Sequence, residues 1–268
     1  MLPVVASAQV ASPSLQDLIS QQSVSEVFRD TEGAFVVIDC KTSEVFKFNP
    51  ELAERPNVPC STFKIWNTLI GLEEGVIKGA DLPFYKWDGV KRSLPDWNKD
   101  LTLKEAFKAS CVPAFQGLAR IIGPDRMMRW IDKLDYGDKD LSAGVDVFWL
   151  PMEGRKCIRI SPTAQAELIC RLVNGKLPAS AASVATLKDV MKVETTPRGL
   201  LYGKTGSGNP GSKPDFKSSN DFSMGWFVGF LAHGGRDYAY ACLVLGPDLS
   251  GKDAKRMVET VFRKNHIL

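Results

Sequence analysis

The hydrophobic positions of this sequence form two kinds of block, namely short β-prone runs near both chain ends and helical spacing between them. Residues 34–40 are rich in valine, isoleucine and phenylalanine, and a turn over residues 41–43 connects them to residues 44–48, which predicts a β-hairpin. Further strands are predicted over residues 199–204, 225–231 and 238–245, with a glycine-containing turn at 233–236.

Between these strands the apolar residues recur at helical spacing. Residues 61–74 leave little polar face, which predicts a central buried helix that ends at Gly75. Amphipathic helices are predicted over residues 15–28 and 253–264, outside the strands. Other helices are predicted from their start signals. These are a capping box at Thr102 to Glu105, first-turn prolines at Pro113 and Pro124, and the pair Ser161-Pro162.

The order of these elements predicts an α+β fold. An antiparallel β-sheet is built from both chain ends, is flanked by the terminal helices and lies beside an all-helical lobe. We expect one domain over residues 9–268, with a sheet lobe at about 15–58 and 195–268 and a helical lobe at about 59–194. The cleft between two such lobes is a natural ligand site.

Composition narrows the classes of partner. The 268 residues include 34 lysines and arginines against 31 acidic residues, a net charge of +3 that argues against nucleic acid or an anionic membrane as the main partner. No apolar run reaches the roughly 18 residues that span a bilayer, so we expect no membrane insertion. Neither His233 nor His266 suits a catalytic triad or a metal site, and the six cysteines form no C-x-x-C pair.

Residues 1–8 read as a short apolar run that ends in Ala6-Ser7-Ala8, like the small-residue cleavage site of a signal peptide. We interpret them as a signal-peptide remnant, which predicts a periplasmic or secreted protein. A disordered segment rich in alanine and serine is the alternative.

The only Ser-x-x-Lys in the chain is Ser61-Thr62-Phe63-Lys64. Residues three apart share a helix face, so Lys64 can reach the Ser61 hydroxyl. Burial disfavours the ammonium form, and such a lysine can act as a neutral base. A helix cap followed by a solvated lysine is the ordinary explanation of this motif alone.

Two further short motifs follow. Ser110-Cys111-Val112 comes after the predicted capped helix, and Lys204-Thr205-Gly206 closes a predicted strand, where a glycine allows close approach of a ligand. Each is weak alone, since a turn serine and an exposed strand-end lysine are common. Their order after Ser-x-x-Lys is far more specific than any one of them.

The set resembles that of serine β-lactamases and penicillin-binding proteins. Ser-x-Val in the middle, where relatives carry Ser-x-Asn, is similar to class D, the oxacillinase type. Other segments that carry this resemblance are Tyr136-Gly137, Phe148-Trp149-Leu150 and 225–229, and the likeness runs from about residue 23 to residue 262.

The resemblance implies a role for each matching residue. Ser61 is the acylated nucleophile, Lys64 is the general base, carboxylated by CO2 or bicarbonate, and Ser110 relays a proton to the departing nitrogen. No other cofactor is implied, and the substrate is a small β-lactam. The remaining implied residues are Phe63, Val112, Trp149 and Leu150 around the base, the backbone N–H groups of Ser61 and Ser207 as oxyanion hole, and Lys204, Thr205, Gly206 and Arg256 at the substrate carboxylate.

Some alternatives stay open. A β-lactam sensor domain that acylates without turnover, or a D,D-peptidase, would share this fold. The family usually shows Tyr-Gly-Asn where this chain has Asp138, which we interpret as a structural turn residue. Cys60 and Cys111 flank the two catalytic serines and are a candidate disulfide in an oxidising compartment, with two free buried thiols as the alternative.

Overall fold

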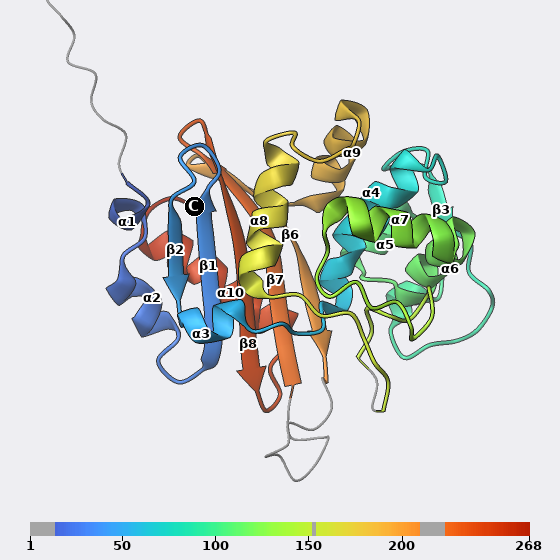
Figure 1. Cartoon of the computed structure of the whole chain (residues 1–268), viewed down its shortest axis with the longest axis horizontal. Helices are drawn as coiled ribbons and strands as arrows, with labels where there is room; N and C mark the ends of the chain where they lie inside the picture. The colour runs from blue at the N-terminus through green and yellow to red at the C-terminus, as the bar shows by residue number, and fades with distance from the viewer. Residues whose placement is uncertain (1–13, 152–153, 210–222) are drawn as a thin grey trace, which may run out of the picture.

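The computed structural model describes residues 14–151, 154–209 and 223–268. Its main feature is a six-stranded sheet in the order β2-β1-β8-β7-β6-β5, antiparallel at every pairing (Figure 1). The strands are β1 (Glu32–Asp39), β2 (Val45–Phe48), β5 (Lys192–Thr195), β6 (Gly199–Gly208), β7 (Ser223–His233) and β8 (Arg236–Gly246). Because β1 pairs with β8, the two chain ends meet inside one sheet, and the predicted α+β fold is confirmed.

Both faces of the sheet are covered, which explains why residues 34–38 are apolar without alternation. Side chains of successive strand residues point to opposite faces, and every residue of β1 after Glu32 is buried. Phe35 and Val37 pack with the C-terminal helix α10 (Gly251–Lys264), whereas Ala34 and Val36 belong to the core on the other face.

That other face is covered by α8 (Pro162–Val173), which begins at the predicted Ser161 cap. It packs against β1, β7 and β8, although its residues fall in the range expected for the helical lobe. The lobe itself holds α4 (Lys64–Glu73), α5 (Leu103–Lys108), α6 (Val112–Ile122), α7 (Pro124–Leu134) and the small sheet β3 (Pro83–Tyr85) with β4 (Leu101–Thr102) (Figure 1). Helix α9 (Ala181–Met191) contacts α4 and α5.

The predicted N-terminal helix is two helices, α1 (Leu15–Leu18) and α2 (Gln21–Val27). Ser20 interrupts the pattern, because its side chain accepts the Ser23 N–H and so starts a second helix. A short α3 (Pro50–Glu54) follows β2. The predicted signal-peptide remnant at residues 1–8 lies outside the described residues.

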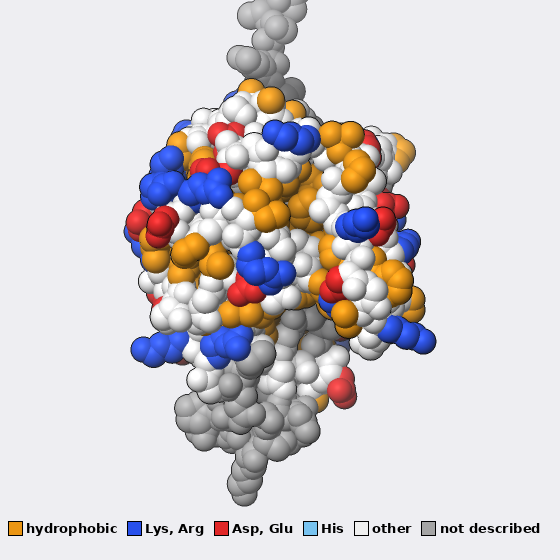
Figure 2. All heavy atoms as spheres, turned by 90° about the vertical axis from the view of Figure 1, so that its right-hand side faces the viewer, with side chains coloured by type: hydrophobic (Ala, Val, Ile, Leu, Met, Phe, Trp, Pro, Cys, Tyr) orange, Lys and Arg blue, Asp and Glu red, His pale blue; other side chains and the backbone are white. Residues whose placement is uncertain are grey.

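Among the described residues, no helix is both long and apolar enough to cross a membrane. The end of the helical lobe shown in Figure 2 mixes basic, acidic and apolar side chains, so this face carries no continuous basic surface. Within the described part of the chain, no group of histidine, cysteine and acidic side chains has a metal-binding arrangement.

Candidate active site

Ser61 and Lys64 lie together at the start of the central helix. The chain makes a 3₁₀ turn, η1 (Cys60–Phe63), before α4 begins at Lys64. The Nζ atom of Lys64 lies 2.8 Å from Oγ of Ser61. Lys64 is completely buried, and burial lowers the pKa of its amine to about 7. A neutral amine is therefore accessible near neutral pH beside the serine hydroxyl.

Aromatic rings pack around the start of α4. The Phe63 ring stacks on Trp149 with centroids 5.4 Å apart, and Lys64 Nζ lies 5.4 Å from the centroid of Phe115. Trp149 is fully buried, and its Nε1 atom has no hydrogen-bond partner among the described residues. An unpaired buried donor is costly, so this N–H is available to an acceptor beyond the described side chains.

The other predicted apolar residues occupy nearby elements. Val112 is the first residue of α6, and Leu150 is half-buried and packs against the same core as Phe63 and Trp149. Their role in the base pocket stays a prediction.

A second serine–lysine pair joins the helical lobe to the sheet. Nζ of Lys204, in β6, lies 3.1 Å from Oγ of Ser110 and donates to the Thr205 carbonyl at 2.8 Å. Burial, and to a lesser extent the charge of Lys64, lowers the pKa of Lys204 well below its ordinary value. The contact between Lys204 and Ser110 brings the second and third predicted motifs together.

Ser110 occupies a strained backbone position that the sequence did not reveal. Its φ is 53°, in the left-handed region, directly after the C-cap of α5 at Ala109. The N–H of Ser110 bonds to the Phe107 carbonyl and that of Cys111 to the Ala106 carbonyl, the pair of bonds that defines a Schellman motif. Glycine is the usual residue at this position of the motif. A serine here accepts backbone strain, which is typical of functional sites.

The residue before the nucleophile is strained in the same way, since Cys60 has a φ of 52°. Gly206 explains how the sheet comes close to this turn. A Cβ atom on Gly206 would lie 3.0 Å from the Pro59 carbonyl oxygen and 3.2 Å from the Thr62 nitrogen. The backbones of Ser61 and Ser207, each one residue from this contact, are thereby brought near each other, as an oxyanion hole requires.

Arg256 does not line the pocket that contains Lys204 and Thr205, so its predicted contact with the substrate carboxylate stays a prediction. Its side chain is 72% exposed, pairs with Asp253 and lies in a separate hollow beside α2. Lys255, one residue earlier, lines the pocket that contains Lys204 and Thr205. Adjacent residues of a helix point about 100° apart, so a shift of one position is enough to turn a side chain out of the cleft.

The predicted disulfide is also absent, because Cys60 and Cys111 are both free thiols. The Sγ atom of Cys60 lies 3.6 Å from Sδ of Met224 in β7, while Cys111 caps the start of α6 in the helical lobe. The two side chains belong to different sides of the site, although their neighbouring serines meet in it.

Asp138 has a structural environment. Its carboxylate accepts the backbone N–H groups of Arg159 and Asp140, and its own N–H donates to the Arg159 carbonyl. Gly137 beside it has a φ of 56°, and a Cβ there would collide with the Arg159 carbonyl. These bonds support the interpretation of Asp138 as a turn residue.

The family model of the penicillin-binding-protein transpeptidase domain matches residues 33–264, which are most of the chain. The fold and the two serine–lysine pairs therefore define a protein of the penicillin-recognising class.

Several relatives narrow this class. The probable β-lactamase YbxI of Bacillus subtilis is 34% identical over 246 residues, which cover 92% of this chain and 85% of the relative. β-Lactamase OXA-10 of Pseudomonas aeruginosa is 38% identical over 211 residues, 78% of this chain and 74% of the relative. The solved class D β-lactamase of B. subtilis superposes with a TM-score of 0.82 at 33% identity, covering 93% of this chain and 98% of that one. The chain belongs to the class D β-lactamases, which are hydrolases.

Proposed function

We propose that the chain hydrolyses the amide bond of penicillins and related β-lactams through an acyl-enzyme on Ser61. The observation that carries this proposal is the buried Ser61–Lys64 pair. Because the two side chains are 2.8 Å apart and the pKa of the lysine is lowered, the lysine amine can accept the proton of the serine hydroxyl. The Ser61 Oγ–carbon bond then forms and the ring C–N bond breaks. Water later attacks the acyl carbon and releases Ser61 with the opened product.

We further propose that Lys64 is carboxylated. A neutral amine can add to CO2 with release of one proton, and the complete burial of Lys64 keeps the site dry. The unpaired Nε1 donor of Trp149 supports the fit of an anionic acceptor in this pocket. When present, the carbamate supplies an anionic base in place of the amine.

Ser110 and Lys204 serve the departing nitrogen. The Ser110 hydroxyl lies 3.1 Å from Lys204 Nζ, so the lysine can replace the proton that the serine gives to the ring nitrogen. Lys204 and Thr205 then hold the ring carboxylate. The backbone N–H groups of Ser61 and Ser207 stabilise the developing oxyanion.

A sensor domain is the second candidate. The regulatory protein BlaR1 of Bacillus licheniformis is 26% identical and matches 88% of this chain, but this covers 37% of its own length. Such a domain would be acylated at Ser61 without turnover. A D,D-peptidase, the third candidate, usually carries asparagine where this chain has Val112.

Steady-state hydrolysis of a penicillin and a chromogenic cephalosporin decides among these functions. The wild type and Ser61→Ala should be compared with and without bicarbonate, together with Ser43→Ala as a matched exposed-serine control. We expect many turnovers that rise with bicarbonate and vanish only in Ser61→Ala. One acylation per molecule without turnover would overturn the hydrolase proposal in favour of the sensor.

We also propose that the protein is exported and contributes to antibiotic resistance. A hydrolase exported to the periplasm or medium would protect a bacterium from penicillins. Expression behind an export signal in a susceptible host should raise the inhibitory penicillin concentration, and Ser61→Ala should abolish that increase.

A further inference from the structure

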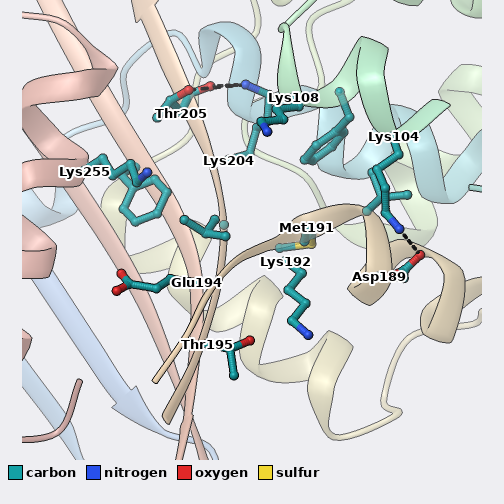
Figure 3. A pocket seen from close by; sticks show the side chains of 15 residues that line it. Lys104, Lys108, Asp189, Met191, Lys192, Glu194, Thr195, Lys204, Thr205 and Lys255 are labelled. Atoms are coloured by element: carbon teal, nitrogen blue, oxygen red, sulfur yellow. Dashed lines mark hydrogen bonds and ion pairs between the residues drawn. The ribbon is translucent and has the colours of Figure 1, made fainter. Parts of the chain in front are cut away.

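A pocket of about 460 Å³ includes Lys204 and Thr205 of the catalytic site in its lining (Figure 3). The end of α5, the end of α9, strands β5 and β6, and α10 form its walls. Its apolar lining includes Phe107, Met191 and Phe227. The catalytic mechanism proposed above uses only the Lys204–Thr205 end of this pocket.

The charges around the pocket are unequal. Five lysines line it against two acidic residues, namely Lys104, Lys108, Lys192, Lys204 and Lys255 against Asp189 and Glu194. Both carboxylates are already engaged, since Asp189 lies 2.8 Å from Lys104 and Glu194 accepts both of its bonds from Arg263. Figure 3 shows the Lys104–Asp189 pair at one wall, away from Lys204.

Two cations remain for a ligand. In the described part of the chain, the side chains of Lys108 and Lys192 make no hydrogen bond or ion pair, and both are exposed at the pocket. Lys255 keeps only a 3.5 Å contact with Glu259. An excess of positive charge over an apolar floor suits an anion carried on a flat ring.

We propose that this pocket binds a second, negatively charged substituent of the β-lactam, attached to its fused ring beside the ring carboxylate. The inference rests on the proposed function, because Lys204 and Thr205 must hold that carboxylate. In a cephalosporin the carboxylate is on C4 and the variable substituent on the adjacent C3, so a group on C3 reaches past Lys204. The substrate class is cephalosporins with an anionic heteroaromatic C3 group.

Cefotaxime and ceftriaxone provide a matched pair of probes. They share one acyl side chain, but C3 carries a neutral acetoxymethyl group in the first and an acidic triazine thioether in the second. Second-order rate constants for acylation of Ser61 can be measured by quenched-flow mass spectrometry, which requires no turnover. The variant is Lys108→Gln with Lys192→Gln, and the control is Lys41→Gln with Lys91→Gln, which removes the same charge from exposed positions outside the pocket.

We expect the ceftriaxone-to-cefotaxime ratio of rate constants to fall about threefold to tenfold in the pocket variant. The control should leave the ratio unchanged, and high salt should reduce the wild-type preference. An unchanged ratio in the pocket variant, an equal fall in the control, or penicillin acylation without cephalosporin acylation would overturn this inference alone. Absence of acylation by every β-lactam would overturn the proposed function as well.

Discussion

The two serine–lysine pairs of the site are built in different ways. Ser61 and Lys64 are three residues apart on consecutive helical turns, so their 2.8 Å approach follows from local geometry. Ser110 and Lys204 are 94 residues apart and meet at 3.1 Å only because the helical lobe packs against β6. The local pair can be recognised as a motif in the sequence, whereas the distant pair forms only when the whole fold is in place. The local pair is expected to control the reaction more strongly.

The largest expected effect comes from removing the base of the local pair. Lys64→Met should lower the acylation rate on the order of 10⁴-fold, because Ser61 loses its proton acceptor. Folding should survive, since methionine suits a fully buried site and avoids the cost of burying an amine. Acylation kinetics and thermal unfolding check this, with Lys176→Met as an exposed control. A loss below tenfold would show that another group is the base.

Replacing Ser110 tests the distant pair. Ser110→Ala and Ser110→Gly should both lower the acylation rate on the order of 10²-fold to 10³-fold, because the departing nitrogen loses its proton donor. The glycine variant should be more stable than the alanine variant by about 1 kcal/mol, since the position has a φ of 53°. Denaturant unfolding measures this difference. Equal stabilities would contradict the strain assigned to Ser110.

A smaller effect is expected at Trp149. Trp149→Phe keeps the ring that stacks on Phe63 but removes the Nε1 donor. Turnover should fall about tenfold without added bicarbonate, and excess bicarbonate should restore part of it. Steady-state rates across a bicarbonate series check this. The same loss at every bicarbonate concentration would contradict a role in holding the carbamate.

The last expected effect is on stability instead of rate, and concerns its dependence on pH. Burial lowers the pKa of Lys64 from 10.5 to about 7 in the folded protein. Between these values the unfolded chain binds more protons, so the contribution of Lys64 to stability improves as pH rises, by up to about 1.4 kcal/mol per pH unit. Without bicarbonate, the unfolding free energy of the wild type should therefore rise relative to that of Lys64→Met between pH 7 and pH 9. A constant difference would contradict the lowered pKa.

The sequence predicted what local chemistry determines. The capping box of Thr102 and Glu105 and the first-turn prolines Pro113 and Pro124 are all confirmed. The single N-terminal helix was wrong because Ser20 offers a local cap that competes with the apolar pattern.

Features that depend on tertiary geometry were missed or misplaced. Lys255, and not the predicted Arg256, lines the pocket that contains Lys204, and periodicity alone does not fix the rotation of a helix. The left-handed backbone of Ser110 has no signal in a serine. The basic pocket draws its lysines from elements far apart in the chain, including Lys108 in α5 and Lys192 in β5.

The central claim is that a buried, neutral Lys64 captures CO2 and serves as the base of Ser61. The most direct measurement is ¹³C NMR of the protein in ¹³C-bicarbonate, recorded for the wild type and Lys64→Met, with turnover measured in the same samples. We expect a carbamate resonance in the wild type alone, and an activity that is lost and regained with that resonance as bicarbonate is removed and restored. Full activity without the resonance would contradict it.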